Sequence, residues 1–465
     1  MGALRSGFLY GEAPASGDRK AGQQAAERSA HDEALRLFTS AAALQEQDPT
    51  VEPVEREAVL LGLVRALTRL ARPLEAWEPA ASAARSALAR EDAADAAAAL
   101  LAITDGMVWG WRSHPEWDDE AIALWEAVLS AQAPADVLTR AHLTAAIAVE
   151  LLYRPGSADR ATALADSAVA MVRRSGGRGF AELQVLRLAQ MALLRPDLLH
   201  HRAPLSEEIV ALSAQVGDPS SMASALTARA QDRAEVGRLA DAHSDVVRAH
   251  DLAQRHHLSQ NWMVSGWCLA MRRQLDEEWD DAERLVGDLE AFQATLAMAG
   301  VGIGLAQLAN LRDLNGRLPE LEPALREAAP FHTALRELHA LALLRSGASE
   351  EVRMRLGAYA EQPAFSFDYM WMPFMAVRAE VWCGLGDREA AADLYGQLLP
   401  YADRLAISVP VSFRGSMQLT LGRLALAVGD ADLAREHLLV ARRVHADLGL
   451  PAWTALTDEA LAPLA

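Results

Sequence analysis

Three groups of aromatic side chains are the residues of this sequence best suited to binding chemistry. Tryptophans crowd the stretches "MVWGWRSHPEWDDEAIALW" and "SQNWMVSGWCLAMRR", and six aromatic residues fall within "FSFDYMWMPFMAVRAEVWCG". Eleven tryptophans against six tyrosines is a high proportion for one chain. Aromatic rings stack on ligands and anchor peptides, and a neighbouring arginine adds a polar contact.

We therefore predict a ligand-binding groove built from these groups, their neighbouring arginines and one further tyrosine. The candidate residues are Trp109, Trp111, Arg112, Tyr153, Trp262, Trp267, Arg272, Phe367, Tyr369 and Trp371. The alternative is that the same rings pack as core between successive helices. No spacing of residues in the sequence separates these two interpretations.

Histidines and acidic clusters are weaker candidates for chemistry. His243, His250 and His257 lie seven residues apart, and seven helical residues rise about 10.5 Å, which is too far for one metal ion to join two of them.

The acidic runs at residues 116–121 and 278–283 come where a helix is expected to begin, and carboxylates are favoured there without any ligand. The sequence has no G-x-S-x-G motif for a nucleophilic serine. We predict no catalytic residue, no metal site and no cofactor.

The elements that must position the aromatic groups are helices in a repeated pattern. A small residue is followed after twelve positions by an anchor that is most often alanine, and then by apolar residues four and seven positions further on. Gly422, Ala434, Leu438 and Ala441 show this pattern, and the anchors recur at positions 242, 282, 321, 352, 391 and 434. Two antiparallel helices pack closely where small residues face each other, and an apolar ridge then stacks on the next pair.

The repeat predicts an all-α fold, a right-handed superhelical solenoid of about ten helical hairpins. The hairpins are expected over residues 26–450, after a flexible tail at residues 1–25 and before a capping helix at residues 451–465. The first helix of each hairpin lines the concave surface of such an array. All three aromatic groups fall on or just before expected first helices.

Charge and cysteine content restrict the partners and the compartment. The formal net charge of -19 argues against direct binding to nucleic-acid phosphates. No run of eighteen apolar residues is free of charge, and no signal-peptide core is present. The two cysteines fall in apolar helical stretches, as reduced thiols do. We predict a cytoplasmic protein that acts neither on membranes nor directly on nucleic acid.

The spacing of small and apolar residues resembles that of the tetratricopeptide repeat (TPR). Most of the chain also resembles the C-terminal helical-repeat region of actinobacterial ATP-dependent regulators with LuxR-type DNA-binding domains. The stretches that carry this resemblance are "AVELLYRPGSADRATALADSAVAMVRR", "GDREAAADLYGQLLPYADR" and "GSMQLTLGRLALAVGDADLAREHLLVARRVHADLGLPAW". The resemblance implies a scaffold that senses a ligand or a protein and passes the signal on.

The sequence departs from that family in two ways. It has no G-x-x-x-x-G-K-[ST] loop for nucleotide phosphates, since Lys20 is its only lysine. Only fifteen residues, "PAWTALTDEALAPLA", follow Leu450, too few for a DNA-binding domain. We therefore expect either the isolated sensor portion of such a regulator or a free-standing protein built like it.

The predicted function is a sensor or adaptor that binds a small molecule or a peptide segment in its concave groove and is linked to transcriptional regulation. Protein or peptide partners are expected, and a homodimer is among the expected assemblies. One alternative is a protein–protein assembly module of a regulator without a small ligand, which needs an exposed apolar patch. Another is a helical-repeat enzyme of a biosynthetic pathway, which needs paired titratable groups at one cavity.

Overall fold

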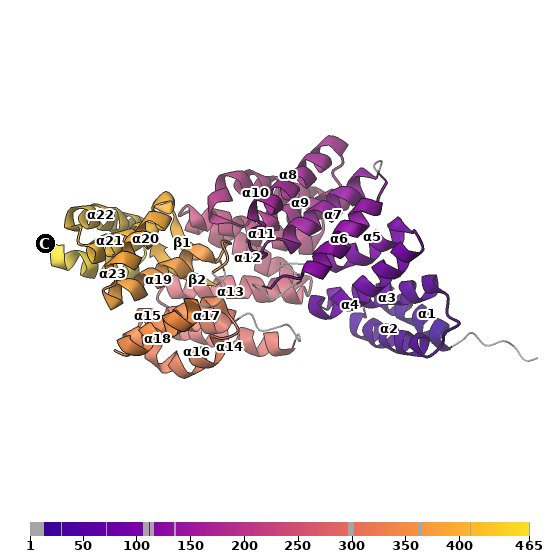
Figure 1. The fold of residues 1–465 in the computed structure, drawn as a ribbon, viewed down its shortest axis with the longest axis horizontal. Coiled ribbons are helices and arrows are strands. Elements are labelled where there is room, and N and C mark those ends of the chain that lie inside the picture. Colours follow the sequence, from indigo (N-terminus) through magenta and orange to yellow (C-terminus); the bar gives the residue numbers. More distant parts are fainter. Residues whose placement is uncertain are drawn as a thin grey trace, which may run out of the picture.

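The computed structural model describes residues 14–28, 30–70, 72–105, 111, 116–133, 136–295, 302–360, 365–409 and 411–464. These ranges contain 23 α-helices, five short 3-10 helices and one two-stranded antiparallel sheet. Successive helices pack as hairpins in an elongated, curved array (Figure 1). The predicted all-α superhelical array of TPR-like hairpins is therefore confirmed, with the small sheet as an addition.

The elements of the N-terminal half are α1 (Pro14–Glu27), α2 (His31–Glu46), α3 (Pro53–Arg69), α4 (Pro73–Ala89), α5 (Ala93–Leu101), η1 (Ala102–Thr104), α6 (Asp119–Ala131), α7 (Val137–Glu150), α8 (Ala158–Ser175), α9 (Phe180–Ala192), η2 (Pro196–Leu198), α10 (Leu199–Val216) and α11 (Pro219–Glu235). The next elements are α12 (Leu239–Arg255), α13 (Ser259–Leu275), α14 (Trp279–Thr295), α15 (Ile303–Leu314), η3 (Leu318–Leu321), α16 (Glu322–Ala328), α17 (Thr333–Arg345) and α18 (Ser349–Ala360). The last are α19 (Trp371–Leu385), α20 (Arg388–Leu398), η4 (Leu399–Tyr401), β1 (Leu405–Ser408), β2 (Ser412–Ser416), α21 (Met417–Val428), α22 (Ala431–Asp447), α23 (Pro451–Leu461) and η5 (Ala462–Leu464).

The two ends of the array differ in how they compare with the predicted boundaries. Helix α1 begins at Pro14, inside the range assigned from sequence to a flexible tail, and packs on α2. Helix α23 packs on α22, in the place expected for a capping helix. Within the described ranges, no helix is long and apolar enough to cross a membrane.

Close approach of paired helices depends on the small residues of the repeat. A Cβ atom added to Gly422 in α21 would lie 2.6 Å from Cγ of Leu438 in α22. Ala434, Leu438 and Ala441 are fully buried along the same contact. In another copy the small residue of the pattern is Ala270, which is fully buried, and a Cβ atom added to Gly266, one helical turn earlier in α13, would lie 2.7 Å from Cδ2 of Leu289 in α14. The repeated pattern therefore marks the helix–helix contacts that the sequence analysis assigned to it.

The same Gly-to-Ala change has opposite effects at a packed and at an open helical position. We expect Gly422→Ala to lower the free energy of unfolding by about 1–2 kcal/mol, because the new methyl group displaces Leu438. Gly396→Ala lies on the exposed face of α20 with nothing within 4 Å, so it should raise that free energy by about 0.5–1 kcal/mol. Urea unfolding of each variant and of the unaltered chain measures the two changes in the free energy of unfolding. Shifts in the same direction would contradict the packing role of Gly422.

The β1–β2 hairpin is the element that the sequence analysis did not predict. Leu405 pairs with Ser416, and Ile407 with Phe413. Every residue of both strands is buried, because the hairpin lies between the C-terminal helices and the middle of the array (Figure 1). Strand β1 contacts α11 and α19, and strand β2 contacts α15, α19 and α22. The hairpin thus joins helices that are far apart in the chain.

A buried cation fixes strand β2. Arg414 is 3% exposed, donates to Oδ2 of Asp313 at 2.8 Å, and forms an ion pair with Glu380. Arg345 in α17 bonds the same two carboxylates, at 2.8 and 2.7 Å. Burial opposes the charged form of Glu380, but Arg414, Arg423 and Arg345 outweigh it and hold the pKa of this carboxyl well below its usual range. These ion pairs bring α15, α17, α19 and the hairpin together.

A buried histidine holds the turn from β2 into α21. The Ser416 backbone N–H donates to Nε2 of His445 at 2.8 Å, and His445 Nδ1 lies 3.0 Å from Oγ1 of Thr457. Because Nε2 accepts a bond, the proton of the neutral ring is on Nδ1. Burial lowers the pKa of His445 to about 4. The hairpin is thereby joined to α22 and α23.

The neutral state of His445 predicts a loss of stability in mild acid. The ring titrates near pH 6.5 in the unfolded chain and near pH 4 in the fold. Its contribution is therefore complete above pH 6.5 and is lost as the pH falls toward 4, by about 2–3 kcal/mol. Urea unfolding between pH 7 and 4.5 measures how steeply the free energy of unfolding falls as the pH is lowered. In His445→Gln this slope should be smaller than in the unaltered chain, because about one proton fewer is taken up on unfolding. The control is His256→Gln, at an exposed position, and equal slopes in the two variants would refute the assignment.

Candidate functional site

A cavity lies between α9, α11 and the loop that follows α7. It holds about 930 Å³ of space, including the part that opens to solvent. Helices α7, α9 and α11 are the first helices of successive hairpins, so the cavity lies on the side where the sequence predicts a groove. Its lining residues are Thr104, Leu152, Tyr153, Gln184, Arg187, Leu188, Gln190, Met191, Leu194, Ser224, Ala225, Thr227, Ala228, Gln231, Tyr369 and Val409.

Two segments from the C-terminal half close this cavity. Tyr369, just before α19, is hydrogen-bonded to Tyr153, just after α7. Burial raises the pKa of both phenols, so both stay protonated at neutral pH. Asp368 fixes the backbone beside Tyr369, since its Oδ1 accepts from the Met370 N–H at 2.8 Å. A tyrosine pair therefore joins the seventh helix of the chain to the nineteenth.

The second closing segment is the tip of the β1–β2 hairpin. The Val409 N–H donates to Oε1 of Gln231 in α11 at 2.6 Å, across 178 residues of sequence. Nε2 of Gln231 donates to the carbonyl oxygen of Ile407 at 3.2 Å and to Oε1 of Glu235 at 2.8 Å. Gln231 is 4% exposed. One glutamine thus satisfies two backbone groups of the hairpin and holds Val409 in the cavity wall.

The polar part of the wall comes from α9. Arg187 Nη1 donates to Oε1 of Gln184 at 3.0 Å. Burial lowers the pKa of Arg187 to about 10, although Asp218 opposes this. Gln184 is 4% exposed, and its Nε2 has no hydrogen-bond partner among the described residues. Arg187 is also the only charged side chain among the described residues that line the cavity.

The structure brings two of the predicted groove residues together at this cavity, Tyr153 and Tyr369. Trp109 and Arg112 lie outside the described residues. The part of the chain that is described also contains no group of three or more His, Cys, Asp or Glu side chains able to hold a metal ion.

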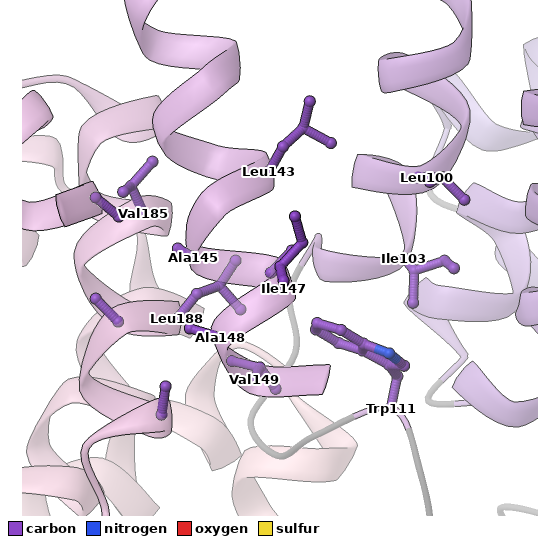
Figure 2. Packing of buried hydrophobic residues seen from close by; sticks show 14 of the residues in the cluster. Leu100, Ile103, Trp111, Leu143, Ala145, Ile147, Ala148, Val149, Val185 and Leu188 are labelled. Carbon is purple, nitrogen blue, oxygen red and sulfur yellow. The ribbon is translucent and has the colours of Figure 1, made fainter. Parts of the chain in front are cut away.

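Two predicted groove residues are core residues instead. Trp111 is 2% exposed, lies 5.7 Å from the Trp125 ring and donates from Nε1 to Oε2 of Glu150 at 2.7 Å. Figure 2 shows it beside Ile103 and Ile147. Trp267 is fully buried. Burial removes both rings from any ligand in a groove, so core packing, the alternative that the sequence left open, holds for these two tryptophans.

Phe367 and Trp371 pack against each other at the start of α19. Their rings meet edge to face at 5.0 Å, and the Arg195 guanidinium lies 5.4 Å from the centre of the Phe367 ring. Trp371 is buried, and Phe367 is half-buried. Neither side chain lines the cavity beside Tyr369. They instead support the segment that carries Tyr369.

Trp262 and Arg272 lie on α13, away from the cavity. Trp262 meets Phe292 edge to face at 4.9 Å. Arg272 donates to Asp276 at 2.8 Å and lines a smaller apolar hollow with Cys268 and Val409. These two predicted residues are therefore not brought together with Tyr153 and Tyr369.

Sequence reasoning missed the polar residues of the wall, Gln184, Arg187 and Gln231. They belong to no motif, and Gln and Arg on a helix usually indicate an exposed face. The available signal was position: Gln184 and Arg187 share one face of a first helix, and Gln231 lies one residue after Ala230, a small residue of the repeat pattern.

Comparisons with known proteins give likenesses of structure only. No family model matches the chain, and no curated protein matches it. A Rap protein solved in complex with competence and sporulation factor is similar at 12% identity and a TM-score of 0.45, over 83% of this chain and 97% of that one. Aspartyl phosphate phosphatase F from Bacillus subtilis gives 12% identity and a TM-score of 0.41, over 89% and 98%. A chain of the APC/C hetero-tetramer Cut9–Hcn1 gives 14% and 0.40, over 97% and 93%.

Replacing Gln231 tests how the cavity is closed. We expect Gln231→Leu to lower the free energy of unfolding by about 2–3 kcal/mol, because the Val409 N–H and the Ile407 carbonyl lose their partner inside the protein. Hydrogen exchange should become faster at residues 405–416. Gln190→Leu is the matched control, since Gln190 also lines the cavity but bonds Ser206 in α10 instead of the hairpin. Equal exchange of the hairpin in both variants would show that Gln231 does not hold it.

Proposed function

We propose that this chain is a helical-repeat sensor or adaptor that holds a small organic molecule in the cavity between α9, α11 and the closing segments. The observation that supports this best is the wall of α9, where the guanidinium of Arg187 lines the cavity beside Gln184, whose amide nitrogen has no hydrogen-bond partner among the described residues. A buried polar group without a partner costs about 1–3 kcal/mol. A ligand that accepts a hydrogen bond from the Gln184 amide removes that cost.

The shape of the cavity favours a small molecule over a long peptide. A peptide segment needs a groove open along several repeats, whereas Tyr369 and Val409 cross this one. Cavities that hold small ligands are lined mostly by apolar side chains with a few polar groups, and the lining here has that character. The enzyme alternative has little support, because the two phenols at the cavity bond each other and their raised pKa values keep them from acting as bases at neutral pH.

The proposal includes a protein partner and a link to transcriptional regulation, both of which rest on the resemblance described above. Extended surfaces of helical-repeat arrays commonly bind proteins. A molecule in this cavity would touch α9, α11, the Tyr369 segment and the hairpin at once. Its presence would therefore favour one arrangement of the two halves, and a partner that reads this arrangement would receive the signal.

Native mass spectrometry of the gently purified full chain tests the proposal. We expect a co-purifying mass of a few hundred daltons that is lost on denaturation. Ala228→Trp should abolish the adduct, because Ala228 lines the cavity and an indole ring would fill it. Ala392→Trp, at an exposed position of α20, should retain it. A chain that is always bare, or an adduct that survives in Ala228→Trp, would refute binding at this cavity.

A further inference from the structure

We infer that the cavity selects small monocarboxylic acids, with the carboxylate against Arg187 and Gln184 and an apolar body against the remaining wall. This inference rests on the proposed function and specifies the chemical class of its ligand.

The charge around the cavity favours one negative group. The chain as a whole carries a formal charge of -19, yet Arg187 is the one charged side chain among the described lining residues. Acidic residues further along α11 are already engaged, since Asp232 and Glu235 both bond the buried Arg202. Asp218 interacts with the charge of Arg187, but none of the described lining residues is a carboxylate that could attract a positive ligand.

The hydrogen-bond donors fit a carboxylate. Gln184 and Arg187 are three positions apart on α9, so they share one helix face, and the contact between them holds the amide and the guanidinium side by side. The amide nitrogen of Gln184 has a donor to spare. Two adjacent oxygens of one carboxylate can accept from an amide and a guanidinium together, and hydrogen bonds between charged groups are the stronger kind.

Burial makes an anion more favourable still. Burial lowers the pKa of Arg187, and Asp218 offsets only part of this effect. An anion beside Arg187 offsets the rest, since an opposite charge favours the charged form. A phosphate monoester would bring about two negative charges to one cation and leave the excess buried. One arginine therefore indicates a single negative charge.

The rest of the lining indicates an apolar body. Leu152, Leu188, Met191, Leu194, Ala225 and Val409 line the cavity together with the rings of the two tyrosines. Such a surface contributes about 25 cal/mol for each Å² of apolar area that the ligand buries. An aliphatic or aromatic acid satisfies both the polar and the apolar part of this wall.

The test compares ligands of one shape that differ only in charge. Ligand-observed NMR with the full chain would use three series: octanoate, octanamide and octylamine; 4-phenylbutyrate, 4-phenylbutanamide and 4-phenylbutylamine; indole-3-acetate, indole-3-acetamide and tryptamine. We expect the carboxylate of at least one series to bind at least tenfold more tightly than its amide and its amine. Ala228→Trp should abolish this binding.

The variants assign the selectivity to the proposed residues. Arg187→Gln should weaken carboxylate binding by tenfold or more and leave amide binding within about twofold. Arg174→Gln, at an exposed position of α8, is the matched control and should change neither. Since the comparison of carboxylate and amide is made in the unaltered chain, it decides the question even if Arg187→Gln does not fold.

The other outcomes separate the two proposals. Amides or amines that bind as well as the carboxylates, and that Ala228→Trp displaces, would overturn the carboxylate inference and leave the binding cavity standing. Binding of no compound in any series, together with a bare chain in native mass spectrometry, would overturn both.

Discussion

The arrangement of this protein depends on the burial of one cation, Arg414, between the carboxylates of Asp313 and Glu380. These partners come from α15 and α19, so the cation can be satisfied only when both helices and strand β2 are in place. A buried ion pair of this kind adds little net stability compared with apolar packing, but breaking it leaves a charge unpaired. Its main effect is to allow one position for the hairpin. That position places Val409 against α11 and so completes the cavity.

The cations of this chain are almost all arginines, and the structure shows why that composition suits it. Arg202 bonds Asp232 and Glu235, and Arg345 bonds Asp313 and Glu380. The planar guanidinium has several donors in a fixed arrangement, so one side chain can hold two carboxylates from different elements. A lysine ammonium group offers a single point of charge. In a stack of hairpins, such bridges fix how each hairpin lies on the next.

The helical array could be predicted from sequence because its determinants are local. Positions such as Gly422, Ala434 and Leu438 are set by contacts within one hairpin, and the spacing of small and apolar residues records those contacts directly. The hairpin of β1 and β2 leaves no such record. Its strands are four and five residues long and buried on both faces, so they lack the alternation that marks a strand with one exposed side.

The site was predictable only in part, for a related reason. Aromatic residues attract attention by type, and Tyr153 and Tyr369 do meet at the cavity. Residue type alone could not separate them from Trp111 and Trp267, because large rings serve equally well in a core. Gln184 and Arg187 were missed because their role comes from the curvature of the array and from segments that return to α9 and α11 from the far end of the chain.

The bonds from Gln231 to the hairpin also change how the array comes apart. In a simple repeat array each hairpin touches only its neighbours, so unfolding can proceed along the chain from either end. Here two hydrogen bonds join Gln231 to residues that are 176 and 178 positions further along the chain. The chain between α11 and β1 therefore forms a closed ring. If any helical hairpin between α11 and β1 unfolds, strand β1 loses part of its support, and the other helices that contact β1 are weakened in turn. We therefore expect the segment from α11 to β1 to unfold cooperatively, as a single domain does, whereas the helices from α1 to α6 lie outside this ring and should be able to unfold one hairpin after another.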